Sequence, residues 1–229
     1  MRAFDLSRYS ALTPLGVSPL TQSFSAVCEG QRVLLKQLKP ALAAEESTRR
    51  AWVEQARLAS RIRHPSVVEV LECGEVGNTA YLSAAWIEGC SLRKALDLRP
   101  PEARKLEPGD VVQVARDVLT ALDVLASASA PLLHLNITPD NLLLTPEGTV
   151  MLTEPCLWQA IPVQDAARLW FDSGKVGYQS PEQVEARGML DARSDLFSLG
   201  SVLYELLTGT RPFTGKTQLM VAMAISRGE

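Results

Sequence analysis

The segment His134–Asn141, with the sequence HLNITPDN, is the part of the chain whose residue types bear most directly on chemistry. At its centre Asn136 carries a carboxamide, which has no useful basicity near neutral pH and so cannot act as a general base. Asn141 and the carboxylate of Glu154 offer oxygen atoms of the kind that bind Mg²⁺. These residue types argue against proton transfer by this segment and leave a metal site at Asn141 and Glu154 open.

The composition predicts a folded chain with a sizeable core. Its 229 residues suit one large or two small domains, and 46% of them are apolar against 21% charged. The formal net charge is -3 and the sequence shows no basic stripe, so nucleic acid is not an expected partner.

Cysteine usage and hydropathy bear on the compartment. Cys28, Cys73, Cys90 and Cys156 are widely spaced without a C-x-x-C pair, which predicts neither a zinc site nor a disulfide framework. Reduced thiols are typical of the cytosol. The N-terminus has no apolar signal core, and no run approaches the ~18 apolar residues of a membrane span. The expected location is the cytoplasm, or the cytoplasmic side of a membrane protein if the chain is a fragment.

The positions of these residues depend on the elements around them, and the first part of the chain predicts a small β-rich unit with one helix. Residues 45–62 follow helical periodicity, because Trp52, Ala56 and Ala59 recur at spacings of three and four. His64-Pro65 ends that helix. Strands are expected over residues 32–36, 67–73 and 80–87.

Beyond Gly89 the sequence predicts mainly helices. One begins at Pro108-Gly109-Asp110, with Asp110 as its expected cap. A hairpin is expected over residues 142–152, and residues 154–180, which have no clean period, predict a long loop. Residues 195–207 are apolar on nearly all sides and predict a central buried helix.

This layout resembles the eukaryotic-type protein kinase fold, and bacterial Ser/Thr protein kinases in particular. The segment HLNITPDN resembles the family's catalytic loop H-R-D-[IL]-K-P-x-N, of which it keeps the His, the Ile, the Pro and the final Asn. The resemblance implies an α+β, two-lobed fold with an N-lobe over residues 1–87 and a C-lobe over residues 88–229. Other segments that resemble family motifs in the family's order are Val33–Lys36, Arg63–Val68, Tyr81–Leu92, Gly174–Glu182 and Asp191–Gly200.

The resemblance also shows which catalytic positions have changed. Asn136 stands where the family has the Asp that accepts the substrate proton, and Thr138 stands where it has the catalytic Lys. Glu154-Pro155-Cys156 replaces the metal-binding D-F-G, so Glu154 could still bind Mg²⁺ together with Asn141, although its side chain is one methylene longer. Cys156 is expected to be a small buried filler. Leu135 replaces the Arg that reads a phosphorylated activation loop, so that switch is expected to be absent.

The nucleotide-binding positions implied by the resemblance are altered as well. In the register of the G-x-G-x-x-G loop the chain has Gly16, Ser18 and Thr21, and an ordinary strand-turn-strand is the favoured interpretation. Lys36 is in register for the lysine that contacts the α- and β-phosphates, so a phosphate contact and a plain structural role remain alternatives. Its helix partner is expected to be Gln55 instead of a Glu, unless a one-residue shift of the helix brings Glu54 there.

Three apolar positions of the implied adenine pocket are Leu34 at its roof, Leu143 at its floor and Ala84 at the gatekeeper. The family has Ala at the roof. Because overfilling a packed site costs about 1–3 kcal/mol, Leu34 predicts a narrowed pocket. A contact between Leu34 and Leu143 could close the two lobes without nucleotide.

The positions that keep the family residue are structural ones. His134 is expected in the core, bonded to backbone, and Asp195 is expected to anchor the backbone of the catalytic loop. The turn Ser180-Pro181-Glu182 and Gly200 belong to the same scaffold. Lys175 stands where the family has a Thr that bonds the catalytic Asp and Lys.

Two functions follow from this pattern. The first is a catalytically inactive pseudokinase that serves as a binding or allosteric signalling module for a protein partner, such as another kinase or a C-terminal region of its own. The alternative is an atypical ATP-dependent Ser/Thr kinase or nucleotidyl transferase that holds Mg·ATP with Lys36, Asn141 and Glu154. The residues give only weak support for ATP and Mg²⁺ as cofactors.

The end of the chain differs from the resembled family, which continues through further helices after Pro212-Phe213. We therefore expect a fragment of a longer protein. Otherwise the apolar helix over residues 195–207 would be partly uncovered, which would favour oligomers or a bound partner.

Overall fold

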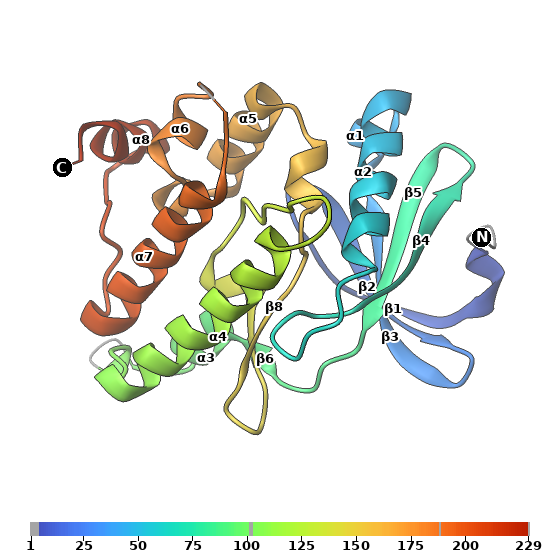
Figure 1. Cartoon of the computed structure of the whole chain (residues 1–229), viewed down its shortest axis with the longest axis horizontal. Helices are drawn as coiled ribbons and strands as arrows, with labels where there is room; N and C mark the ends of the chain where they lie inside the picture. The colour runs from blue at the N-terminus through green and yellow to red at the C-terminus, as the bar shows by residue number, and fades with distance from the viewer. Residues whose placement is uncertain (1–4, 101–102, 188, 229) are drawn as a thin grey trace.

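The computed structural model describes residues 5–100, 103–187 and 189–228. A five-stranded antiparallel sheet with one long helix forms the first half, and a mainly helical half follows it (Figure 1). The expected α+β, two-lobed fold is thereby confirmed. Among the described residues, none of the helices is long and apolar enough to cross a membrane.

The sheet of the first half has the strand order β1-β2-β3-β5-β4. Its register places Leu34 of β3 opposite Ala84 of β5, and Lys36 opposite Leu82, so these side chains meet at the centre of the sheet. The five strands are β1 (Tyr9–Val17), β2 (Thr21–Cys28), β3 (Gln31–Leu38), β4 (Val70–Val76) and β5 (Thr79–Ala85).

One long helix, α2 (Glu46–Ala59), follows the short α1 (Pro40–Ala43) and packs on this sheet. The predicted inward face is confirmed, because Trp52, Ala56 and Ala59 are all buried. The helix ends at Ala59, ahead of His64-Pro65 and three residues before the predicted end at residue 62.

The second half surrounds a small three-stranded sheet with helices. Its strands are β6 (Cys90–Ser91), β7 (Leu142–Leu144) and β8 (Val150–Leu152), and β7 and β8 form the predicted hairpin. The α-helices are α3 (Leu92–Asp97), α4 (Pro108–Ala126), α5 (Val163–Ser173), α6 (Pro181–Val184), α7 (Ala192–Thr208) and α8 (Gln218–Arg227). Short 3₁₀ turns are η1 (Leu6–Arg8), η3 (Pro139–Asn141), η4 (Leu157–Ala160) and η5 (Val176–Tyr178).

The start of α4 corrects one expectation. Glu107 is the N-cap, without a side-chain hydrogen bond, and Pro108 is the first helical residue, so Asp110 lies inside the first turn and does not cap the helix. Proline suits that first position because its fixed φ is already helical and its missing N–H has no partner to lose there.

The central helix α7 is less uniformly buried than its apolar sequence predicts. Leu196, Tyr204 and Leu207 are each nearly half exposed, whereas Asp195 and Glu205 are buried. The buried polar groups are tolerated because each has partners: Glu205, for example, accepts hydrogen bonds from Arg93 at 2.9 Å and from the hydroxyl of Tyr178. The helix therefore buries hydrogen-bonded polar groups beside the apolar Leu199, Val202 and Leu206, and leaves other apolar side chains outside.

The largest correction concerns residues 154–180, which were expected to be a loop. Helix α5 (Val163–Ser173) occupies the middle of this segment, with Gly174 in the left-handed conformation at its C-cap. Trp170 of α5 stacks on Trp158 of η4 at 5.1 Å between ring centroids, and both rings are buried against the core that contains Trp52 of α2. The spacing of four between the buried Ala166 and Trp170 was the available sequence signal.

We expect the tryptophan stack to hold α5 in place. Trp170→Ala should lower the free energy of unfolding by about 3–5 kcal/mol, the usual cost of removing a buried large aromatic side chain. Trp170→Phe should cost less, because the Nε1 atom that it removes has no hydrogen-bond partner among the described residues. Urea unfolding of both variants measures the difference, and equal losses would contradict a packing role for the ring.

Candidate functional site

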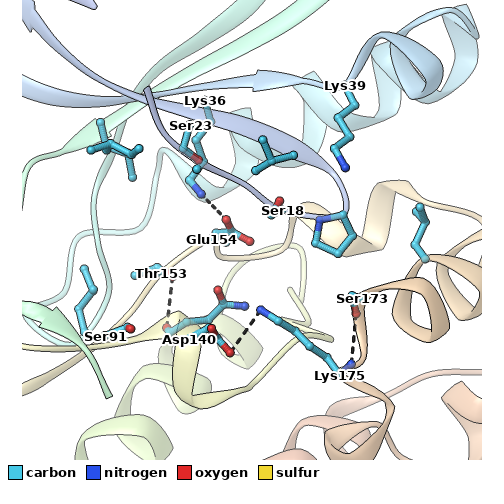
Figure 2. Close-up of a pocket in the computed structure, with 18 of the residues that line it drawn as sticks. Ser18, Ser23, Lys36, Lys39, Ser91, Asp140, Thr153, Glu154, Ser173 and Lys175 are labelled. Carbon is cyan, nitrogen blue, oxygen red and sulfur yellow. Dashed lines mark hydrogen bonds and ion pairs between the residues drawn. The ribbon is translucent and has the colours of Figure 1, made fainter. Parts of the chain in front are cut away.

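A cavity of about 840 Å³ lies where the two halves face each other. Residues of β1, β2 and β3 line it from the sheet, and residues of η3, β7, the β6–α3 junction and the end of α5 line it from the helical half (Figure 2). The elements that were expected to carry an active site therefore converge, and α5, which was not expected, forms part of the wall.

An ion pair between Lys36 of β3 and Glu154 dominates the cavity. The two side chains are only 10% and 7% exposed, and the Nζ of Lys36 donates to Oε1 of Glu154 (Figure 2). Burial alone would raise the pKa of the Glu154 carboxyl, but the charge and hydrogen bond of Lys36, with smaller contributions from His134 and Lys175, hold it below its usual value. Glu154 is therefore an ionised carboxylate that is already neutralised from within the protein.

This pair corrects the expected partner of Lys36. The Oε1 atom of Gln55 is buried without a hydrogen-bond partner among the described residues, so Gln55 does not bind Lys36. Glu54 does not replace it, because its carboxylate pairs with Arg57 at 2.6 Å on the outer side of α2. The partner is instead Glu154, in the segment after β8. Its side chain is one methylene longer than that of the Asp in the family motif D-F-G.

The backbone of the segment His134–Asn141 is fixed from below by Asp195 of α7. Its two carboxylate oxygens accept hydrogen bonds from the N–H groups of His134 at 2.8 Å and Leu135 at 2.7 Å. The ring of His134 is fully buried, with its Nε2 atom 2.6 Å from the carbonyl oxygen of Thr153. The structural roles expected for His134 and Asp195 are those that the structure shows.

The side chains at the two altered catalytic positions do not reach the cavity. Asn136 is 3% exposed and Thr138 is fully buried, and neither lines the cavity wall. The Oδ1 atom of Asn136 and the Oγ1 atom of Thr138 have no hydrogen-bond partner among the described residues. Neither side chain therefore presents a polar group to a ligand in the cavity.

The cavity does not fit a divalent cation. Glu154 is committed to Lys36, and the carboxylate of Asp140 lies 3.3 Å from the ammonium group of Lys175. Asn141 lines the cavity, but its Nδ2 atom is bonded to the carbonyl oxygen of Asn136 at 2.8 Å and it carries no charge. The described residues include no group of three or more His, Cys, Asp or Glu side chains that could hold a metal. A hard cation favours several anionic oxygens, but lysines already pair with two of the three carboxylates that line this cavity.

Backbone N–H groups of the turn between β1 and β2 form hydrogen bonds within the turn itself. The N–H of Ser18 donates to the carbonyl oxygen of Thr21 at 2.8 Å, the N–H of Thr21 donates to Oγ of Ser18 at 3.0 Å, and Pro19 has no N–H. Gly16 lines the cavity, but the turn has few free donors with which to surround a phosphate.

The apolar end of the cavity stays open. Leu34 and Leu143 both line it, and the closure of the two lobes by a contact between them stays a prediction. Ala84 and Leu82 line a separate small pocket of about 10 Å³, which shares Leu34 with the cavity. Cys156 is fully buried, and burial raises the pKa of its thiol, which fits the expected role of a filler.

Sequence reasoning missed several polar residues of the cavity wall. Lys39 follows β3 directly, Lys94 lies in α3, and Lys175 follows the C-cap of α5. Nothing in the motif at the catalytic loop pointed to Lys39 or Lys94. Lys175 was noted only as a departure at a threonine position, because the helix that places it was itself not predicted.

Comparisons with known proteins agree with this architecture. The protein kinase domain profile matches residues 12–228. The Ser/Thr-protein kinase PknL of Mycobacterium tuberculosis is 35% identical over 190 residues, which cover 83% of this chain and 46% of PknL. The Ser/Thr-protein kinase PrkC of Bacillus subtilis is 26% identical over 218 residues, which cover 94% of this chain and 33% of PrkC. The chain thus spans less than half the length of these curated relatives.

A solved structure shows the same fold. The crystal structure of a point mutant of the Mycobacterium tuberculosis PknI kinase domain superposes with a TM-score of 0.73, over 93% of this chain and 78% of the other. At 23% identity this likeness concerns the fold alone.

We expect the Lys36–Glu154 pair to behave as a unit. Lys36→Met and Glu154→Leu alone should each lower the free energy of unfolding by about 3–5 kcal/mol, because each leaves a buried charge without its partner. The double variant should lose much less than the sum of the two. A double-mutant cycle by chemical unfolding measures the coupling.

The matched control for this cycle is Gln55→Ala, which changes a residue of α2 that does not bind Lys36. It should cost much less than Lys36→Met. Additive losses from Lys36→Met and Glu154→Leu would contradict the pairing.

Proposed function

Since this chain belongs to the protein kinase family, as its match over residues 12–228 establishes, we propose that it is a pseudokinase. In this proposal it is a catalytically inactive module that binds a protein partner and acts by binding or allostery. We place it in the cytoplasm or on the cytoplasmic side of a membrane. The kinase activities in the names of PknL and PrkC belong to those proteins and are not assigned to this chain.

The observation that carries the proposal is the state of Asn136. A general base must lie within hydrogen-bond reach of the proton that it removes and must be basic enough to take it. Asn136 is a carboxamide, is 3% exposed and does not line the cavity. Losing a general base typically costs about 10²–10⁴ in rate.

The charges of the site support the same proposal. Phosphoryl transfer depends on cations placed against the transferring phosphate and on metal ions that bridge its oxygens. Here the charge of Lys36 is compensated by Glu154, and the metal-binding carboxylate is consumed in the same contact. The loss of a free cation at Lys36 and the loss of a metal ligand at Glu154 are linked, because one ion pair causes both.

The scaffold, in contrast, is held together without a ligand. Asp195 fixes the catalytic-loop backbone, and Ser180 and Gln183 form a reciprocal capping box at α6. Glu182 accepts a hydrogen bond from the hydroxyl of Ser194 on α7. A fold that is held together around an inactive centre can still bind a protein through its surface. The exposed apolar side chains of α7 form one surface that could contact a protein partner.

A second candidate remains an atypical kinase or nucleotidyl transferase. The observation that favours it is that Lys36, Asn141 and Glu154 all line one cavity of sufficient size for a nucleotide. It requires Glu154 to leave Lys36 and bind a metal. In that case Glu154→Ala should abolish transfer, whereas the pseudokinase has no transfer to abolish.

The decisive experiment is a transfer assay with ATP labelled at the γ- or the α-phosphate, with Mg²⁺ or Mn²⁺ and general protein substrates. An active kinase domain from a relative serves as the positive control. We expect no transfer above that of Lys36→Ala, and a rate at least about 10⁴-fold below the control, because base and metal ligands are both missing. Transfer of either label that disappears in Lys36→Ala or Glu154→Ala would refute the pseudokinase.

A further inference from the structure

The charges that line the cavity leave it with a surplus of cations. Four lysines, Lys36, Lys39, Lys94 and Lys175, face three carboxylates, Asp140, Glu154 and Asp172. The Lys36–Glu154 pair is buried and self-contained, so it adds no net charge to the space. The part of the cavity that a ligand meets therefore carries three ammonium groups against two carboxylates.

Of the two cavity lysines without an ion pair among the described residues, Lys39 and Lys94, Lys39 is the more buried. It is half-buried at the end of β3, and no ion pair with it occurs among the described residues. Its ammonium group projects toward the same space as Lys36 and Lys175 (Figure 2). An ammonium group without an internal partner in a cavity wall is available to an anionic ligand.

Lys175 is held more loosely than Lys36. Its Nζ lies 3.3 Å from Oδ2 of Asp140, with the two side chains 25% and 39% exposed, and pairs with this exposure contribute little to stability. Lys175 can therefore bind a ligand phosphate beside Asp140 or in exchange for it. Its position is set by α5, because it follows directly after the C-cap of that helix.

The same lysines disfavour a divalent cation. A metal ion placed between Lys175 and Lys39 would be repelled by both, and Glu154 would have to abandon Lys36 to bind it. Ammonium groups instead supply directly the positive charge that a metal would otherwise bring to a polyphosphate. The apolar side chains of Leu34 and Leu143 line the same cavity and offer faces for a flat ring.

We propose that this cleft binds a polyphosphate anion, as a nucleotide or as an inorganic chain, without a divalent cation, and that Lys39 and Lys175 carry the recognition. This inference rests on the proposed function, since a non-catalytic site has no need of the metal. It departs from the catalytic use of the fold, in which metal ions bridge the phosphates.

The test is calorimetric titration of the intact chain with ATP, inorganic tripolyphosphate and adenosine, each in EDTA and again with Mg²⁺. We expect ATP, tripolyphosphate or both to bind in EDTA, no more weakly than with Mg²⁺, and binding should weaken as salt rises. Stronger binding of ATP identifies a nucleotide site, and stronger binding of tripolyphosphate identifies an inorganic one. Tight binding of adenosine with no gain from phosphates would overturn the proposal.

Variants sharpen the test. Lys39→Ala and Lys175→Ala should each weaken metal-free binding about tenfold, the usual effect of losing one charge-assisted hydrogen bond. Lys216→Ala, an exposed lysine outside the cavity, is the matched control and should change nothing. Thermal unfolding of each variant confirms that the fold is intact. Binding that Lys39→Ala and Lys175→Ala leave unchanged would overturn the proposal.

The outcomes separate this proposal from the pseudokinase. Metal-free binding without phosphoryl transfer supports both. The absence of binding and of transfer overturns the polyphosphate site alone. Binding that requires Mg²⁺, is lost in Asn141→Ala and is accompanied by transfer overturns both.

Discussion

The buried ion pair between Lys36 and Glu154 is the interaction on which the rest of the site depends. It joins the central strand of the sheet to the segment that follows β8, and so connects the two halves of the molecule through charges that are almost inaccessible to water. Either charge alone would be costly in that position. Once they are paired, the lysine is neutralised and the carboxylate is bound to it, so in the proposed pseudokinase one contact accounts for two missing requirements of phosphoryl transfer.

The neighbouring features are consistent with that constraint. Amides of the β1–β2 turn bond within the turn, Asn136 and Thr138 are buried and do not line the cavity, and the end of α5 forms part of its wall. What remains in the cavity is a set of lysines without catalytic partners. Asp195 anchors the framework of the fold, and on our proposal the cleft serves electrostatic binding in place of metal-assisted catalysis.

Much of this could be predicted from sequence, because the predicted features are local or depend on a fixed spacing. The periodicity of Trp52, Ala56 and Ala59 predicted the inward face of α2, and the motifs around His134 and Asp195 predicted their backbone contacts. The partner of Lys36 could not be predicted, because Glu154 lies 118 positions away in the sequence. Their contact depends on the tertiary fold and on the length of the glutamate side chain. Helix α5 was missed because its burial depends on a stack between Trp158 and Trp170, a tertiary contact that overrides a weak local pattern. The place of Lys175 in the cavity wall was missed with it, because α5 positions Lys175.

The central claim is that Glu154 is an ionised partner of Lys36 and not a metal ligand. Carbon-detected NMR titration of the Glu154 carboxyl, in the native chain and in Lys36→Met, tests this most directly. The account predicts that Glu154 stays ionised below the usual pKa of 4.5, and that Mg²⁺ leaves its signal unchanged. Because the folded pKa is lowered, the stability from this pair should be complete above that value and be lost as pH falls through the folded pKa, and Lys36→Met should raise the pKa. A native pKa at or above the usual value, or a shift of the signal on adding Mg²⁺, would contradict the account.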